Sequence, residues 1–139
     1  MNVTSDVEKA YKQALSSRRH SYSPYSHFAV GAALKLRGQA LPVGGCNVEN
    51  ASFGATICAE RVAVNAAISV YGKIDPEFIV IVTSEEKATV PCALCLQTLA
   101  EFCKDDFLIY LGNEKSLLQK FTLREILPHP FRHFVVSEK

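Results

Sequence analysis

Three cysteines at the starts of two expected helices constrain this chain more than any other feature. Cys58 opens the segment Cys58-Ala-Glu-Arg61, and two more thiols stand in Pro91-Cys92-Ala-Leu-Cys95. Thiols at a helix start feel the positive end of the helix dipole, which favours the thiolate form. Zinc prefers thiolate ligands, and three protein ligands leave one coordination position for water. The pattern therefore predicts a catalytic zinc site shared by two helices.

Glu60 is the expected acid/base group of this site. It follows Cys58 by two positions, roughly 200° around a regular helix, so spacing alone does not direct it at the metal. A first-turn glutamate is common because the dipole favours it, but zinc-bound water also needs a nearby carboxylate to move its protons. Three thiolates and Zn²⁺ carry a net negative charge, so we expect Arg61 to compensate it. A solvated surface arginine is the equal alternative.

Two other uses of the cysteines stay open. Cys103 lies too far along the second helix to share the metal, roughly 16 Å from Cys92. Cys46 is not excluded by such an argument, so a closed four-cysteine structural site remains an alternative. A redox-active Cys-x-x-Cys pair is another, although it gives no task to Cys58 or Glu60.

Composition narrows the class of protein. The 139 residues, 48% hydrophobic and 21% charged, predict one soluble globular domain over residues 1–139. A formal charge of +1 argues against a nucleic-acid partner, and there is no apolar run of the roughly 20 residues that cross a membrane. The polar N-terminal segment has no apolar core of a signal peptide, so we expect a cytoplasmic protein with reduced thiols.

Apolar periodicity predicts alternating helices and strands. The expected helices cover 4–18, 57–71, 91–103 and a short segment after Thr122, and the expected strands cover 28–36, 40–48, 78–82, 107–111 and 117–121. A turn is expected at 112–114, a close backbone approach at Gly31, and a deeply buried helix at 57–71. This order predicts an α/β three-layer sandwich, with a mixed five-stranded sheet and helices on both faces. The tail carries Phe131, His133 and Phe134.

Two polar segments are ambiguous. Residues 20–27 are rich in turn formers and aromatics, and form either a packed surface loop or the rim of a pocket. Residues 47–50 read Asn-Val-Glu-Asn, which suits either a turn or a small polar wall for a ligand with hydroxyl groups.

Four segments together resemble the small homotetrameric cytidine deaminases: Phe28-Ala-Val-Gly-Ala-Ala-Leu34, Gly45-Cys-Asn-Val-Glu-Asn-Ala51, Cys58-Ala-Glu-Arg61 and Pro91-Cys-x-x-Cys95. The resemblance implies a cytidine-deaminase-like fold. It also implies hydrolytic deamination of cytidine and deoxycytidine to uridine, deoxyuridine and ammonia, a hydrolysis of the C4 amidine bond used in pyrimidine salvage. One Zn²⁺ per chain, held by Cys58, Cys92 and Cys95, would activate the water, and Glu60 would transfer its protons to the base and the leaving amine.

The resemblance also implies substrate contacts within one subunit. Phe28 would stack on the base, and the backbone of Ala59 would touch its edge. Asn47 and Glu49 would hold the ribose 3′-hydroxyl. Tyr25 would line the same pocket.

In this family, neighbouring subunits of a homotetramer complete the pocket. Ala51 and Phe53 would approach the 5′-hydroxyl side, and Phe131 would close over the base. The family commonly reads Pro-Cys-Gly-x-Cys-Arg-Gln, whereas this chain has Ala93 and Leu96 at the glycine and arginine positions. Two further functions therefore stay open: deamination of a modified cytosine nucleoside, and a zinc-stapled binding protein without activity.

Overall fold

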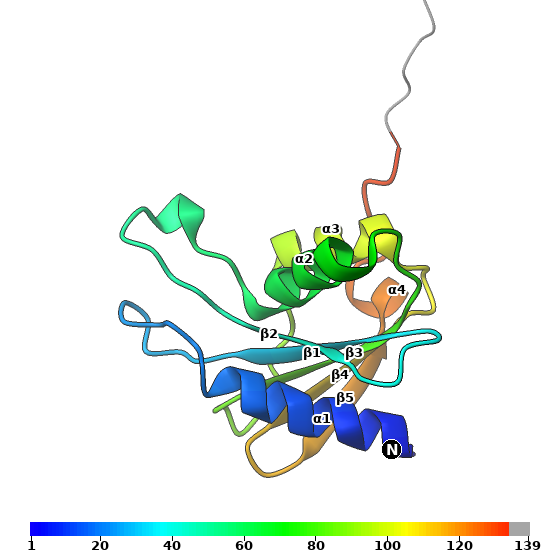
Figure 1. Ribbon diagram of the computed structural model, residues 1–139, viewed down its shortest axis with the longest axis horizontal. Coiled ribbons are helices and arrows are strands. Elements are labelled where there is room, and N and C mark those ends of the chain that lie inside the picture. The colour runs from blue at the N-terminus through cyan, green and yellow to red at the C-terminus, as the bar shows by residue number, and fades with distance from the viewer. Residues whose placement is uncertain (134–139) are drawn as a thin grey trace, which may run out of the picture.

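A mixed five-stranded sheet in the order β2-β1-β3-β4-β5 lies at the centre of the molecule (Figure 1). The computed structural model describes residues 1–133, so Phe134 lies outside the described residues. The strands are β1 (Gly31–Leu36), β2 (Val43–Cys46), β3 (Pro76–Thr83), β4 (Leu108–Asn113) and β5 (Leu117–Thr122). β1 runs antiparallel to β2 and β3, β3 runs parallel to β4, and β4 runs antiparallel to β5. The predicted mixed sheet is confirmed.

Helices cover both faces of this sheet, as Figure 1 shows. The helix α1 (Ser5–Arg18) packs its apolar stripe on one face, where Ala10 and Ala14 meet the buried side chains of β1, β3 and β4. The opposite face carries α2 (Ala59–Tyr71), α3 (Ala93–Phe102) and the short α4 (Leu123–Ile126), with the larger of the two apolar clusters beneath them. A single-turn 3-10 helix, η1 (Phe53–Ala55), stands on the connection from β2 to α2. The expected three-layer arrangement is confirmed.

Two glycines set how closely helices approach the sheet. A Cβ at Gly31 would lie 2.0 Å from the carbonyl oxygen of Ala14, so the close approach expected there is confirmed. A Cβ at Gly45 would lie 2.5 Å from the carbonyl oxygen of Ala59 and equally close to the amide nitrogen of Ala63. The first two turns of α2 therefore rest directly on the backbone of β2.

Some boundaries and exposures differ from the prediction. The first strand begins at Gly31, because the Phe28 carbonyl and the Val30 amide bond to the side chain of Asn47. The turn expected at 112–114 lies slightly later, because β4 continues to Asn113, whose side-chain oxygen accepts hydrogen bonds from the amides of Lys115 and Ser116. The helix α2 is buried on one side only, since Val70 is 70% exposed. Within residues 1–133, no helix has the length and apolarity needed to cross a membrane.

Candidate zinc centre

The three predicted thiols meet between the first turns of α2 and α3. Cys58 is the N-cap residue of α2 and Cys92 that of α3, both in extended conformation, while Cys95 lies in the first turn of α3. The three Sγ atoms lie within 4.8 Å of one another, and those of Cys92 and Cys95 are 3.6 Å apart. Sulfurs about 2.3 Å from a tetrahedral zinc are roughly 3.8 Å apart, so the three thiols fit this ion.

The other two cysteines stand apart from this cluster. In the described part of the chain, Cys58, Cys92 and Cys95 form the one group of three or more side chains arranged to hold a metal ion. Cys46 ends β2, and Cys103 follows α3 with its side chain in the apolar core, 5% exposed. The set is therefore three thiols, which leaves a coordination position for water.

Arg61 lies beside the sulfur of Cys58. Its Nη2 is 3.8 Å from Cys58 Sγ and donates to the carbonyl of Thr56 at 3.4 Å. A hydrogen bond from the Cys95 thiol and the nearby guanidinium together lower the pKa of Cys58 to about 5. Among the described residues, the Nε of Arg61 is also buried without a hydrogen-bond partner. The guanidinium thus places positive charge against the thiolates.

Glu60 shares the cavity that exposes Cys58 and Cys92. Its side chain is 5% exposed, and this burial raises the pKa of the carboxyl group, with the neighbouring Cys58 adding to the shift. In a regular helix, Cys58 and Glu60 would point roughly 200° apart, which does not predict this arrangement. Cys58 is an extended cap outside the helix, so only Glu60 follows helical geometry.

The cavity has a volume of about 310 Å³ and reaches from the sulfurs to the molecular surface. Four of the predicted substrate residues line it: Phe28, Asn47, Glu49 and Ala59. Other lining residues were not anticipated, among them Ser26 and the segment from Thr89 to Pro91. Ser26 belongs to the ambiguous loop 20–27, which therefore forms part of the rim. No periodicity or motif in the sequence pointed to Thr89 or Val90.

Asn47 and Glu49 hold the loop that carries Phe28. The Asn47 side chain accepts a hydrogen bond from the Val30 amide at 2.9 Å and donates one to the Phe28 carbonyl at 2.7 Å. Glu49 accepts from the amides of Tyr25 and Ser26, and the hydrogen bond from the Ser26 hydroxyl is the main reason that the pKa of Glu49 is lowered. The Asn47 bonds take the place of strand pairing at Phe28 and Val30, the Glu49 bonds hold the residues just before them, and Phe28 lines the cavity.

The remaining predicted substrate residues lie outside this cavity. The rings of Tyr25 and Phe53 meet edge to face, 5.8 Å apart, at a shallower hollow that also includes Glu49. Phe53 is 75% exposed, Ala51 is exposed, and Phe131 is 57% exposed on the segment after α4. A single copy of the chain thus gathers only part of the predicted set around the sulfurs.

The two departures from the family motif occupy different environments. Leu96 is 6% exposed and packs in the apolar cluster beneath α3. Ala93 is exposed at the first position of the same helix. Neither residue lines the cavity. Position 96 therefore contributes to the core of this chain.

Comparisons with known proteins agree with the geometry. Residues 4–111 match the family model described as the cytidine and deoxycytidylate deaminase zinc-binding region. The chain is 40% identical to a cytidine deaminase of Halalkalibacterium halodurans, over 91% of this chain and 94% of that protein. It is 38% identical to a cytidine deaminase of Sporosarcina psychrophila, over 91% of each chain. The crystal structure of cytidine deaminase from Burkholderia pseudomallei superposes with a TM-score of 0.84 and 32% identity, covering 89% of this chain and 98% of that one.

The site consists of a buried carboxylate beside three thiols, at the starts of two helices that pack on the five-stranded sheet. Together with the family match, these features define the class of the protein as a zinc-dependent hydrolytic deaminase. Zinc is its cofactor, and the cluster of Cys58, Cys92 and Cys95 is consistent with one zinc site. The chain belongs to the cytidine and deoxycytidylate deaminase family.

Proposed function

We propose that this chain, as one catalytic domain over residues 1–139, deaminates the free nucleosides cytidine and deoxycytidine in pyrimidine salvage. The observation that carries the proposal is that buried Glu60 lines one cavity of about 310 Å³ together with Cys58 and Cys92, while the buried Cys95 completes the cluster of three thiols. That cavity suits a single small ligand. A net charge of +1 offers little attraction for a nucleic acid.

Cys58, Cys92 and Cys95 would hold one zinc ion, which supplies Lewis acidity and lowers the pKa of a water molecule at its open position. Glu60 takes a proton from the attacking water and donates it to N3 of the pyrimidine. The oxygen adds to C4 as the C4=N3 double bond becomes single and N3 takes the proton. The remaining hydroxyl proton would then pass through Glu60 to the amino group, and the C4–N bond breaks to release ammonia as the C4 carbonyl forms. The raised pKa of this buried carboxyl group suits a residue that must both accept and donate a proton.

The surrounding residues would bind and orient the nucleoside. Phe28 would stack on the base, the backbone of Ala59 would meet its edge, and Asn47 and Glu49 would contact the 3′-hydroxyl from the cavity wall. Arg61 would offset the negative charge of three thiolates through its contact with Cys58.

Neighbouring copies in a homotetramer would complete the site. Phe53 and Phe131 lie exposed outside the cavity, and large apolar side chains in such positions commonly mark an interface. Ala51 and Phe53, next to Tyr25, would approach the 5′-hydroxyl side in the assembly, and Phe131 would close over the base of an adjacent subunit. A cytoplasmic location would keep the zinc-binding thiols reduced.

Replacing Glu60 with glutamine tests the mechanism. The Glu60→Gln variant keeps the size of the side chain but cannot transfer protons, so turnover of cytidine should fall by about 10²-fold or more while one zinc per chain is retained. The decrease in ultraviolet absorbance during deamination and the zinc content measure the two quantities. Near-normal turnover in a zinc-loaded variant would rule out this role, and binding of cytidine without turnover by the unaltered protein would indicate a binding protein.

A further inference from the structure

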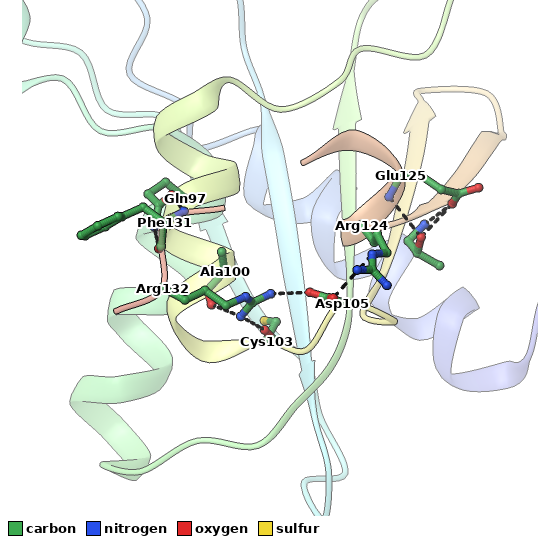
Figure 2. Close-up of polar contacts among 9 residues, drawn as sticks. Gln97, Ala100, Cys103, Asp105, Arg124, Glu125, Phe131 and Arg132 are labelled. Atoms are coloured by element: carbon green, nitrogen blue, oxygen red, sulfur yellow. Dashed lines mark hydrogen bonds and ion pairs between the residues drawn. The ribbon is translucent and has the colours of Figure 1, made fainter. Parts of the chain in front are cut away.

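The segment after α4, residues 127–133, is here termed the C-terminal arm, and its residues Phe131 and Arg132 contact α3 and the end of that helix (Figure 2). Its contact with α3 begins at Gln97, whose side-chain amide bonds to both backbone groups of Phe131. Gln97 Nε2 donates to the Phe131 carbonyl at 2.6 Å, and the Phe131 amide donates to Gln97 Oε1 at 3.2 Å. Such a paired bond fixes the peptide direction at the residue that carries the ring.

Arg132 makes a second contact, immediately after Phe131. Its Nη1 donates to the carbonyls of Ala100 and Cys103, at 2.6 and 3.0 Å, where the end of α3 leaves backbone carbonyls without helical partners. Its Nη2 donates to Asp105 Oδ1 at 2.7 Å. A cation at this position also interacts favourably with the helix dipole. The guanidinium thus closes the arm onto the end of α3.

Asp105 connects this contact to α4, from which the arm departs. The Arg124 amide donates to the Asp105 carbonyl at 3.0 Å, and its guanidinium lies 3.6 Å from the Asp105 carboxylate. The start of α4 is itself fixed, because Thr122 and Glu125 form a reciprocal capping box. The arm therefore starts from a fixed helix and is held again at the backbone of Phe131 and at the next residue, Arg132.

We propose that Gln97 and Arg132 are positioning residues that hold the arm so that the Phe131 ring is preset to close over the base in an adjacent subunit. This inference rests on the proposed function, which gives Phe131 that place. Figure 2 shows the ring projecting away from the contacts that hold its backbone, and it is 57% exposed. An arm already in its bound conformation loses less entropy when substrate binds, which strengthens binding.

Substituting Gln97 tests the first contact. Gln97→Leu retains the approximate shape of the side chain but removes both bonds to Phe131, so the competent arm conformation is populated less. We expect KM for cytidine to rise about three- to tenfold, with kcat changed less than about twofold. The Gln119→Leu variant, at an exposed position on β5, is the matched control and should keep the KM of the unaltered protein.

A double-mutant cycle shows whether Gln97 acts through Phe131. Phe131→Ala alone should raise KM, and adding Gln97→Leu to it should raise KM no further, because the positioned ring is already gone. If the two effects multiply instead, Gln97 does not act through Phe131 and the inference is overturned. If Phe131→Ala leaves KM unchanged, the place of Phe131 in the proposed function fails first.

The contact made by Arg132 is tested by comparing a substitution at Arg132 with one at Arg124. Arg132→Ala removes the arm contact, whereas Arg124→Ala removes the other guanidinium on Asp105 and leaves the arm bonds in place. We expect the first variant to raise KM several-fold and the second to leave it within about twofold. Equal effects from both would overturn the assignment to Arg132. Zinc content and the thermal midpoint identify a variant that has merely unfolded, and Arg132→Lys then replaces Arg132→Ala as a milder test.

A fluorescence readout is independent of activity. The chain contains five tyrosines but no tryptophan, so Phe131→Trp introduces a single tryptophan at the position in question, and its emission can be excited apart from that of the tyrosines. Its steady-state anisotropy should fall when Gln97→Leu or Arg132→Ala is added, because the arm then moves on the nanosecond timescale. Unchanged anisotropy in both double variants would show that these side chains do not hold the arm, whatever the role of Phe131 in binding.

Discussion

Glu60 illustrates what residue spacing could and could not predict. The residue types at 58, 60, 92 and 95 were sufficient to predict a three-thiol zinc set with a carboxylate, and the structure brings these four side chains together. The direction of the Glu60 side chain relative to the thiols could not be predicted, because the helical angle between positions 58 and 60 applies only if Cys58 belongs to the helix. Whether a residue is a cap or the first helical position depends on the preceding loop, which no periodicity describes.

Cys103 gives a pH prediction at the scale of a single residue. Burial raises the pKa of its thiol from 9.0 to about 12, although nearby Arg132 opposes the shift. The folded-state pKa exceeds the unfolded one, so the stabilisation from the neutral thiol is complete below pH 9 and is lost as pH rises toward 12.

Urea unfolding of the protein and its Cys103→Ala variant at pH 8 to about pH 11 measures this loss. At pH 8 the unaltered protein should be the more stable, because alanine leaves a small cavity. The difference in unfolding free energy should narrow steadily above pH 9. A difference that stays constant over this range would mean that the thiol does not titrate as its burial requires.

At the scale of elements, the sequence predicts whether a segment is a helix or a strand better than it predicts where that segment begins and ends. All helices and strands expected from periodicity occur in the expected order. The predicted first strand is too long at its start, because Phe28 and Val30 have side chains typical of strands. In the structure, the Phe28 carbonyl and the Val30 amide form hydrogen bonds with the Asn47 side chain instead of with a neighbouring strand. Such long-range bonds between a side chain and the backbone leave no local pattern. The close approach of the Gly45 backbone to the α2 backbone likewise has no local sequence pattern that predicts it.

The Gly45 contact predicts a stability effect specific to α2. Gly45→Ala places a Cβ within 2.5 Å of the Ala59 and Ala63 backbone, so the helix must shift, at a cost of about 1–3 kcal/mol in unfolding free energy. Gly54→Ala is the control, because a Cβ there has nothing within 4 Å. Chemical unfolding with zinc bound measures both variants. Equal stability of the two would show that the sheet and α2 separate more easily than their packing suggests.

At the scale of the whole molecule, one copy of the chain leaves Phe53 75% and Phe131 57% exposed, and neither residue lines the cavity. No local pattern around Phe53 or Phe131 predicts a place in a pocket, which is implied by the resemblance to a family of homotetramers. Their exposure in one copy is consistent with that resemblance. Assembly geometry is not encoded in any local pattern, so it needs an experiment.

Mixed assemblies test whether sites are shared. Glu60→Gln subunits retain Phe131, and Phe131→Ala subunits retain Glu60, so a hybrid tetramer should contain some sites with both groups intact. If subunits share sites as proposed, the co-assembled mixture should show a lower KM than the Phe131→Ala variant alone, with each variant measured by itself as a control. If the mixture behaves as the simple sum of its two components, each site uses the Phe131 of its own chain, or none.

The cavity wall is built partly from helix starts and partly from loops, and this division affects how the substrate range of such an enzyme can evolve. The groups proposed to do the chemistry lie at the caps and in the first turns of α2 and α3, which rest on the sheet, whereas Phe28, Glu49 and Val90 come from loops around the opening. Loops tolerate replacement better than packed helices. New substrates can therefore be acquired by exchanging the rim while the metal-binding helices are inherited unchanged, which makes the same scaffold reusable for other cytosine compounds.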